Sequence, residues 1–312
     1  MSTILVTGAG GGLGSNVVRA ALDRGHTVRA LVRDPNKARL PDGVTPLVGD
    51  ALDSESMRRA ADGCDAVFHL ANVAIGTDWV RLTAEMLDAA IAACRSTGAR
   101  LVFPANVWVF GRGTPGTLVA ESAPLAPCSK LGEARQHKEA KIRGAGIRWT
   151  MIRLPEFYGP HVQTLTGRPL QAISRGQRGR WWGPAAQTIE LVYMPDAAAV
   201  LVAVGLSEGA DGELFHLPGF AHTTAREFLQ AAIRIAGMGT LSVMPTVLVR
   251  AASVVSPLAR SFVDILHLWE HPILLDGTKL RARLPELQLT SYDDGIAATL
   301  AWHRANPAAR MY

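Results

Sequence analysis

The chain has 312 residues, of which 48% are hydrophobic and 19% are charged, a composition typical of a globular protein with a full core and an appended lobe. Its formal net charge is +5, but no run of five or more like charges occurs, so we expect no nucleic-acid partner. The apolar stretches are too short to span a bilayer, no basic leader precedes the first strand, and the three cysteines lack metal-binding spacing, so we expect a cytoplasmic protein without a membrane partner or a metal site.

The predicted elements begin with a strand, a glycine-rich turn and a helix over residues 3–25. In that helix the apolar residues Val17, Val18, Ala21 and Leu22 recur at helical spacing. Further apolar strands alternate with helical segments, and we expect them at 26–32, 44–50, 65–71, 99–105 and 147–154. This alternation predicts an α/β fold built on a Rossmann-type doubly wound parallel sheet.

The regular alternation ends after Arg153, because residues 156–187 are rich in glycine, proline and aromatic side chains. Strand and helix patterns return over 189–218, and the remainder of the chain is mainly helical in pattern. We therefore predict an NADP-binding Rossmann domain over 1–158, to which 189–218 returns. A smaller, mainly helical C-terminal substrate lobe is predicted over 159–312, so the two domains are expected to be interleaved.

Glycines form a GxxGxxG pattern directly between the first strand and the first helix. Gly8 permits a tight turn, Gly11 lets the backbone approach a pyrophosphate, and Gly14 allows close helix packing. The N-terminus of the helix then faces the anion. We predict a dinucleotide site whose pyrophosphate lies against Gly8, Gly11, Gly12, Leu13 and Gly14, with a flexible turn that binds no ligand as the alternative.

The end of the second strand distinguishes NAD from NADP, because an acidic residue there binds a ribose hydroxyl and repels a 2′-phosphate. Arg33 comes first after that strand, and Lys37 adds a second positive charge. The geometry of a guanidinium matches that of a phosphate, so the sequence favours NADP(H). Asp34 is a contrary feature, and the alternative for Arg33 is a solvated surface cation.

Five segments carry a resemblance to a known family: TGAGGGLG at Thr7–Gly14, VGD at Val48–Asp50, FHLA at Phe68–Ala71, NVWVFG at Asn106–Gly111 and LPEFYGP at Leu154–Pro160. On these motifs the chain resembles the short-chain dehydrogenase/reductase superfamily, in its extended or atypical branch of NAD(P)-dependent epimerases, dehydratases and ketoreductases. The resemblance implies further cofactor contacts: Asp50 and Ala51 at the adenine, Ala71 and Asn72 on the ribose side, and Leu154, Pro155 and Phe157 at the nicotinamide amide.

The catalytic tyrosine of that family is missing from the segment PCSKLGEAR, residues 127–135. The family has a serine or threonine, a tyrosine and a lysine at fixed spacings, and these positions hold Asn106, Leu131 and Arg135 here. A second alignment, with Lys130 as the lysine, puts Ala126 at the tyrosine position. The tyrosine that acts as the general acid in that family is therefore absent in both alignments.

Three residues are the catalytic candidates that the resemblance leaves. Arg135 can bind ribose hydroxyls and contribute positive potential, although its pKa forbids proton transfer. Asn106 keeps an amide that can polarise a carbonyl, and its alternative is a turn residue bonded to backbone. Tyr158 follows the sixth strand and is a candidate proton donor, with a structural role as its alternative.

Aromatic side chains and one arginine are predicted to line an apolar pocket, with a plain core role as the alternative: Trp108, Phe110, Phe157, Arg180, Trp181 and Trp182. We expect an NADPH-dependent ketoreductase that passes a hydride to a hydrophobic or aromatic, polyketide-like ketone in antibiotic biosynthesis. In lacking the Ser/Tyr pair the chain is similar to atypical ketoreductases of angucycline polyketide pathways, such as the simocyclinone 7-ketoreductase. A catalytically silent NADP-binding sensor and a sugar-nucleotide epimerase or dehydratase are the alternatives, and the oligomeric state stays open.

Overall fold

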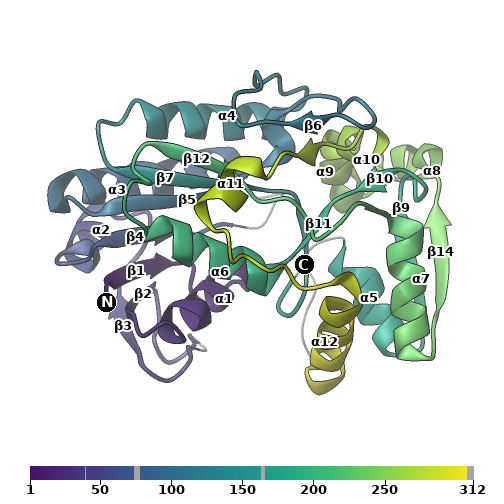
Figure 1. Cartoon of the computed structure of the whole chain (residues 1–312), viewed down its shortest axis with the longest axis horizontal. Coiled ribbons are helices and arrows are strands. Elements are labelled where there is room, and N and C mark those ends of the chain that lie inside the picture. Colours follow the sequence, from purple (N-terminus) through teal and green to yellow (C-terminus); the bar gives the residue numbers. More distant parts are fainter. Residues whose placement is uncertain (39, 74–77, 163–165, 308–312) are drawn as a thin grey trace. The chain divides into compact units, whose positions relative to one another are not determined.

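The computed structural model describes residues 1–38, 40–73, 78–162 and 166–307, which are drawn as ribbons in Figure 1. The chain divides into two compact units, each built from three segments. The first unit comprises Met1–Asn106, Ala134–Arg153 and Ala197–Phe215, and the second comprises Val107–Glu133, Leu154–Asp196 and His216–Tyr312.

These ranges differ from the predicted domains. Residues 107–133 belong to the second unit, because β6 (Leu118–Val119) pairs with β15 (Leu274–Leu275) instead of joining the main sheet. The segment that returns to the first unit is Ala197–Phe215, within the predicted 189–218. The second unit has more residues than the first, so it is not the smaller lobe that the sequence predicted.

The first unit is built on a seven-stranded sheet in the order β12-β7-β5-β4-β1-β2-β3. β1 pairs in parallel with β2 and β4, β2 with β3, and β4 with β5. The strands are β1 (Thr3–Thr7), β2 (Thr27–Val32), β3 (Val44–Val48), β4 (Ala66–His69), β5 (Arg100–Asn106), β7 (Trp149–Leu154) and β12 (Glu213–His216). The prediction of a Rossmann-type α/β fold with a parallel central sheet is confirmed.

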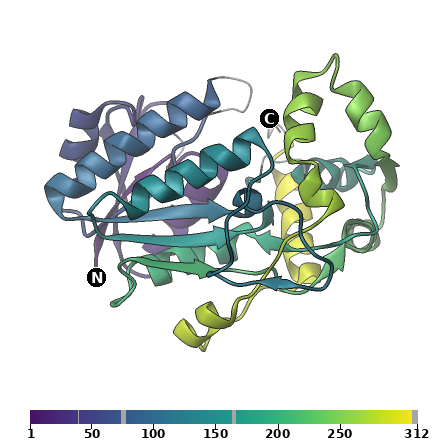
Figure 2. The same ribbon diagram turned by 90° about the horizontal axis from the view of Figure 1, so that it is seen from above.

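Helices cover this sheet because its inner strands β1, β4, β5 and β7 are largely buried on both faces, completely so in β7. They are α1 (Gly12–Leu22), α2 (Ser54–Ala61), α3 (Trp79–Thr97), α4 (Lys130–Arg143) and α6 (Met194–Gly205). Figure 2 shows α3 and α4 running side by side over one face of the sheet. The Lys138 ammonium on α4 donates to the Thr83 hydroxyl on α3, so a polar contact joins the two helices.

The second unit combines short strand pairs with helices. β8 (Glu156–Tyr158) pairs with β11 (Leu191–Tyr193), β9 (Arg178–Trp182) with β14 (Thr240–Met244), and β10 (Thr188–Ile189) with β13 (Thr223–Thr224). A 3₁₀ turn, η1, spans Val107–Val109. The helices are α5 (Gly167–Ser174), α7 (Ala225–Ala236), α8 (Thr246–Ala252), α9 (Pro257–Ile265), α10 (His267–Glu270), α11 (Thr278–Arg283) and α12 (Tyr292–Ala305).

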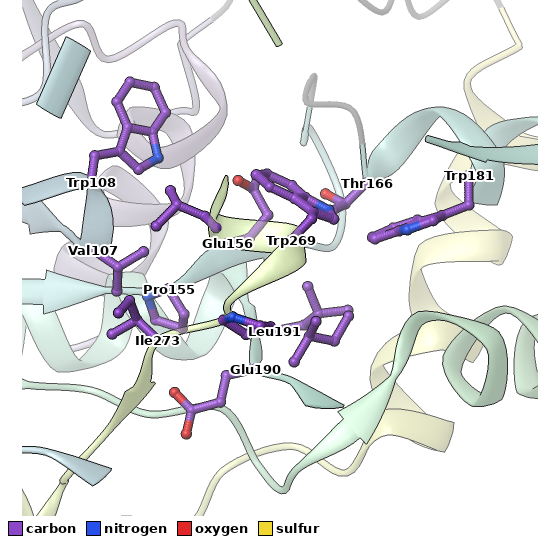
Figure 3. Close-up of a pocket in the computed structure, with 13 residues that line it drawn as sticks. Val107, Trp108, Pro155, Glu156, Thr166, Trp181, Glu190, Leu191, Trp269 and Ile273 are labelled. Atoms are coloured by element: carbon purple, nitrogen blue, oxygen red, sulfur yellow. The ribbon is translucent and has the colours of Figure 1, made fainter. Parts of the chain in front are cut away.

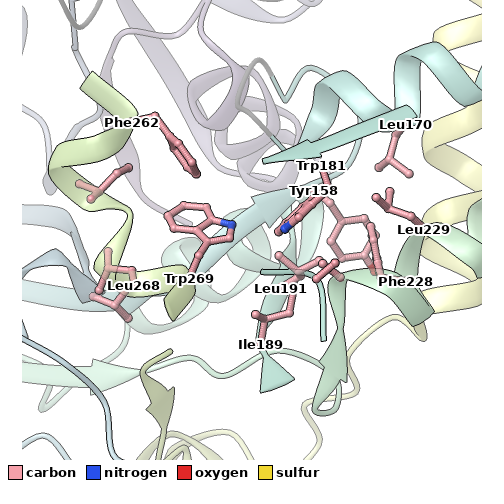
Figure 4. Close-up of a cluster of buried hydrophobic side chains, with 14 of the residues drawn as sticks. Tyr158, Leu170, Trp181, Ile189, Leu191, Phe228, Leu229, Phe262, Leu268 and Trp269 are labelled. Atoms are coloured by element: carbon pink, nitrogen blue, oxygen red, sulfur yellow. The ribbon is translucent and has the colours of Figure 1, made fainter. Parts of the chain in front are cut away.

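Large aromatic and aliphatic side chains form the core of this unit (Figure 4). The Phe262 ring lies 5.0 Å from the Trp269 ring and 5.8 Å from the Trp182 ring, measured between centroids and in edge-to-face geometry. Such aromatic pairs stabilise a fold beyond the area they bury. The aromatic residues that the sequence left as either core or pocket therefore serve partly as core.

None of the helices in the described ranges combines the length and the apolarity needed to cross a bilayer. Within the same ranges, no group of three or more His, Cys, Asp and Glu side chains is placed to hold a metal ion.

Candidate active site

The glycine turn after β1 is tightly packed against the loop that follows β4. Gly8 has a φ of 71°, and a Cβ there would lie 2.6 Å from the Leu70 carbonyl oxygen and 2.8 Å from the Ala71 nitrogen. At Gly14 a Cβ would lie 2.1 Å from the Gly8 carbonyl oxygen. Only glycine fits at either place, so the two predicted roles, a tight turn and close helix packing, agree with the geometry.

The N-terminus of α1 is open to an anion. Gly11 is the N-cap residue, no side chain caps the helix, and the first turn contains no acidic residue. The backbone N–H groups of the first turn, which include Gly12 and Leu13, have no intrahelical partner and point toward the end of the helix. The uncapped N-terminus and the glycine cradle together fit the pyrophosphate of a dinucleotide.

A threonine joins the glycine turn to the predicted ribose side. The Thr7 hydroxyl oxygen accepts hydrogen bonds from the Leu70 and Ala71 N–H groups, each at 3.2 Å, and lies 3.2 Å from His69 Nδ1. His69 is buried, and its burial, with the charges of Lys138 and Arg135, lowers its pKa to about 4. The structure thus brings Ala71 next to Gly8 and gives His69 the structural role that its burial suggests.

Arg33 follows the last residue of β2 and is exposed, and no ion pair or hydrogen bond joins its side chain to another described residue. The Asp34 carboxylate interacts with its own neighbours in sequence: it lies 3.1 Å from the Lys37 ammonium and accepts a hydrogen bond from the Asn36 N–H. The Asp34 carboxylate is therefore partly neutralised, whereas the Arg33 guanidinium is available to a phosphate.

The other predicted nucleotide contacts lie in both units. Asp50 and Ala51 follow β3, are half-buried, and form a turn in which Asp50 accepts the Leu52 N–H at 3.0 Å. Asn72 is exposed, and its amide oxygen accepts the Trp79 indole N–H at 2.8 Å. Leu154 and Pro155 are buried and Phe157 is half-buried, where β7 gives way to β8; these three residues belong to the second unit.

Arg135 lies one helical turn after Leu131 on α4, as the predicted YxxxK spacing requires. Its guanidinium lies over the Trp79 ring, 5.1 Å from the centroid. Burial lowers the pKa of Arg135 to about 10, so the side chain stays protonated at neutral pH. It is a fixed positive charge in an apolar setting, suited to hold hydroxyl oxygens.

Lys138, one turn beyond Arg135, is a residue that sequence reasoning missed. Its ammonium lies 4.0 Å from the centroid of the same Trp79 ring and donates to Thr83. Burial, with a contribution from the charge of Arg135, lowers the pKa of Lys138 to about 7. The spacing i, i+3 from Arg135 was the signal available in the sequence.

A buried ion pair fixes the backbone at Asn106. Arg153 donates from both terminal nitrogens to the two carboxylate oxygens of Glu139, at 2.9 and 2.8 Å, and its Nη1 also donates to the Asn106 carbonyl oxygen at 2.7 Å. Asn106 is half-buried at the last position of β5. The structure thus ties the end of β5 to the helix that carries Arg135.

Leu131 packs against the apolar core of the second unit. Its N–H donates to the Asp264 carboxylate at 3.1 Å, and a Cβ at the neighbouring Gly132 would lie 2.3 Å from the Trp108 carbonyl oxygen. Ser129 accepts the Gly132 N–H, as an N-terminal capping residue does. The position of the missing tyrosine therefore lies beside the segment that contains Trp108.

The structure corrects the prediction for Tyr158. Its ring is fully buried and lies 5.0 Å from Phe228 and 5.4 Å from Tyr193 between centroids. Its hydroxyl oxygen has no hydrogen-bond partner among the described residues, and burial raises its pKa far above the usual value. A phenol in this apolar cluster does not exchange protons with a substrate, so Tyr158 is a core residue.

Three tryptophans line a narrow cavity of about 40 Å³ in the second unit (Figure 3). They are Trp108, Trp181 and Trp269, with Leu191, Leu268 and Ile273 among the aliphatic neighbours. Trp108 and Trp181 were predicted from the sequence, whereas Trp269 and its neighbours were not. Phe110 stands elsewhere, in edge-to-face contact with His216, and Arg180 and Trp182 line an adjacent cavity.

Glu190 is a buried carboxyl group at the same cavity. It accepts the Leu275 N–H at 3.0 Å and lies 3.3 Å from the Nε2 atom of His222. Burial raises the pKa of Glu190 to about 7, and Figure 3 shows its carboxylate pointing away from the tryptophans. The polar side chains among the lining residues are Glu190, Glu156 and Thr166, so the cavity is mainly apolar.

Comparisons with known proteins agree with this architecture. The model of the NAD dependent epimerase/dehydratase family matches residues 4–217. The 4-hydroxy-2-methyl-3-oxo-4-farnesyl-3,4-dihydroquinoline-1-oxide ketoreductase of Stigmatella aurantiaca is 26% identical over 308 residues, covering 95% of this chain and 87% of that protein. The 2-alkyl-3-oxoalkanoate reductase of Stenotrophomonas maltophilia is 31% identical over 222 residues, 62% of each chain.

Solved structures extend the likeness of the fold. The UDP-glucose 4-epimerase of Thermotoga maritima, solved with UDP-glucose, superposes with a TM-score of 0.78 at 20% identity. The match covers 98% of this chain and 99% of that protein. At this identity the likeness establishes the arrangement of the elements and leaves the substrate open.

Proposed function

Because the chain belongs to the NAD dependent epimerase/dehydratase family, we propose that it is an NADP(H)-dependent ketoreductase that reduces a ketone on a hydrophobic or aromatic substrate to a secondary alcohol. Family membership and the reductases among its relatives indicate an oxidoreductase. The proposal concerns the cofactor, the substrate and the mechanism. The observation that carries it is the aromatic lining of two adjoining cavities of about 40 and 300 Å³, since flat apolar rings suit such walls better than a sugar does.

The cofactor would be held by the glycine turn, the N-terminus of α1 and two arginines of the first unit. The cradle of Gly8 and Gly14, with the uncapped α1, fits the pyrophosphate, and Arg33 fits a 2′-phosphate. When bound, NADPH supplies a hydride from its nicotinamide ring. Arg135 would bind hydroxyls of the adjoining ribose, as the lysine at this position does in the family that the sequence resembles.

The carbonyl of the substrate would be polarised by the Asn106 amide, whose backbone Arg153 fixes, or by a phenol of the substrate itself. Leu131 has no proton to give and Tyr158 is buried in the core, so water would supply the proton. Orientation of the two reactants can lower the barrier by about 7–11 kcal/mol in well-aligned systems. Such a mechanism needs no side-chain acid.

Absorbance at the nicotinamide band, followed with NADPH and a panel of polycyclic aromatic ketones, tests the proposal. UDP-glucose and dTDP-glucose are offered separately with NAD⁺ and their products are separated by chromatography, because epimerisation and dehydration consume no net NADPH and leave the nicotinamide absorbance unchanged. Oxidation of NADPH with a ketone supports the reductase. Tight calorimetric binding of NADPH without oxidation by any ketone would instead favour a silent sensor, which the missing acid fits equally well.

A further inference from the structure

A second cavity of about 300 Å³ adjoins the tryptophan-lined cavity within the same unit. The two cavities share Thr166, Trp181 and Trp269 as lining residues, so a single ligand can extend from one into the other. The second is the larger of the two, and its walls are different in kind. Besides Trp182 and Phe262, three arginines line it: Arg168, Arg178 and Arg180.

These arginines face the cavity without acidic partners. No aspartate or glutamate is among the residues that line it. In the part of the chain that the structure describes, no ion pair or hydrogen bond joins any of the three side chains to another residue, and the Arg168 Nε atom is buried without a hydrogen-bond partner. A buried guanidinium nitrogen without an acceptor is costly, which points to a ligand that supplies one.

The positions of the three charges add to this cost. Arg178 and Arg180 alternate with buried residues along β9 and therefore lie on one face of the strand. Arg168 is the second residue of α5, where the positive end of the helix dipole disfavours a cation, and the first turn holds no acidic residue to offset it. An anion in the cavity would relieve both the mutual repulsion and the unfavourable helix position.

We propose that this arginine cavity binds an oxyanion of the substrate, a carboxylate or a phosphate, while the apolar part of the same molecule lies against Trp181 and Trp269, the aromatic walls that the two cavities share. The inference rests on the proposed function, because it names the class of ketone that is reduced: an acidic one. Guanidinium groups match the planar geometry of a carboxylate and the tetrahedral edges of a phosphate, and each charge-assisted hydrogen bond is about twice as strong as a neutral one.

Isothermal titration calorimetry with matched ligands tests the site. The probes are 6-acetyl-2-naphthoate, 6-acetyl-2-naphthyl phosphate and the neutral methyl ester of the former, each titrated with and without saturating NADP⁺, which reduces no ketone. Both acids carry the same ketone and ring system as the ester. We expect at least one acid to bind about tenfold or more tightly than the ester, with an affinity that falls as salt rises.

Two variants distinguish binding at the arginine cavity from a general effect of the protein's positive charge. Arg168→Gln should lower the binding affinity for the acid probes about tenfold and leave the affinity for the ester unchanged. Arg226→Gln is the matched control. Arg226 is an exposed arginine on α7 that lines neither cavity, and its loss removes the same charge from the same unit. If Arg168→Gln fails to fold, the double variant Arg178→Gln/Arg180→Gln replaces it, because both side chains are exposed on β9.

The outcomes decide the two proposals separately. Equal affinity for acids and ester, equal losses for both in the variants, or no binding by either acid would overturn the oxyanion site. An acid that binds through these arginines but is never reduced by NADPH would sustain the site and overturn the ketoreductase. Reduction of the ester as efficiently as the acid would sustain the ketoreductase alone.

Discussion

Glu139 and Arg153 form a bidentate ion pair in which both side chains are almost completely buried, at 2% and 1% exposure. The pair joins α4 to the end of β7, and the same guanidinium also holds the carbonyl oxygen of Asn106. A single guanidinium therefore connects α4, the predicted ribose-binding helix, to the backbone at the end of β5.

Removing one partner of this pair should destabilise the protein strongly, because the other charge is left buried and unpaired. We expect Glu139→Gln to lower the free energy of unfolding by about 3–5 kcal/mol. Urea denaturation followed by circular dichroism measures the change. Asp293→Asn is the matched control, since the Asp293–Arg234 pair is exposed and should be worth about 1 kcal/mol or less. A loss for Glu139→Gln no larger than that of the control would contradict this account.

The glycine cradle predicts a sharp difference between two neighbouring glycines. Gly14→Ala should lower stability by about 1–3 kcal/mol and remove dinucleotide binding, because its Cβ would overlap the Gly8 carbonyl oxygen. Gly10→Ala is the control for stability, since a Cβ there meets nothing within 4 Å. Thermal unfolding with and without added NADPH reports both quantities. Wild-type stability in Gly14→Ala would show that the turn can move to accommodate a methyl group and would contradict the close packing of Gly14 against Gly8.

The position of Arg33 predicts cofactor preference. Arg33→Ala should weaken the binding of NADPH by about 10–100-fold and leave the binding of NADH nearly unchanged, because only NADPH has a 2′-phosphate for the guanidinium to bind. Lys37→Ala, which removes an exposed cation already paired with Asp34, should have a smaller effect. Calorimetric titration of each variant with both nucleotides decides the matter. Equal losses for NADPH and NADH would remove the assignment.

Lys138 predicts a pH dependence of stability. Its pKa is about 7 in the folded state against an ordinary 10.5, so above pH 7 the unfolded chain binds more protons than the folded one. Stability should therefore rise with pH from about 7 to about 10, by up to about 1.4 kcal/mol per pH unit from this group. Lys138→Met should flatten that rise, as denaturation curves at several pH values would reveal. Parallel pH profiles for the two proteins would mean that Lys138 is charged in the folded state.

Restoring the missing tyrosine should not restore a conventional mechanism. We expect Leu131→Tyr to turn over no faster than the wild type on any ketone that proves to be a substrate, because the proposed route uses no side-chain acid. Leu131→Phe is the steric control, as it adds the ring without the hydroxyl. A large gain in kcat for the tyrosine variant over the phenylalanine variant would count against the proposed mechanism.

Local patterns made the sheet and the glycine turn predictable. The packing of Gly14 against Gly8 follows from a strand, turn and helix that lie within a short stretch, and the apolar strands are recognisable by their composition. The pocket was only half predictable, because Trp181 and Trp269 come from distant parts of the chain and meet only in the folded state. Tyr158 was a candidate proton donor because it follows a strand, but its ring packs in the core of the second unit. The position of a residue near a strand end does not determine whether its side chain faces the core or the site.

The backbone passes between the two units five times, and two of these passages fall inside helices, at Glu133–Ala134 in α4 and Asp196–Ala197 in α6. No single cut yields either unit whole. A fragment that ended at residue 158 would lose β12 from the sheet and leave β7 as an edge, with six buried residues and an unpaired row of backbone donors and acceptors. Such an edge recruits other chains, so separate expression of the nucleotide-binding half should produce aggregates.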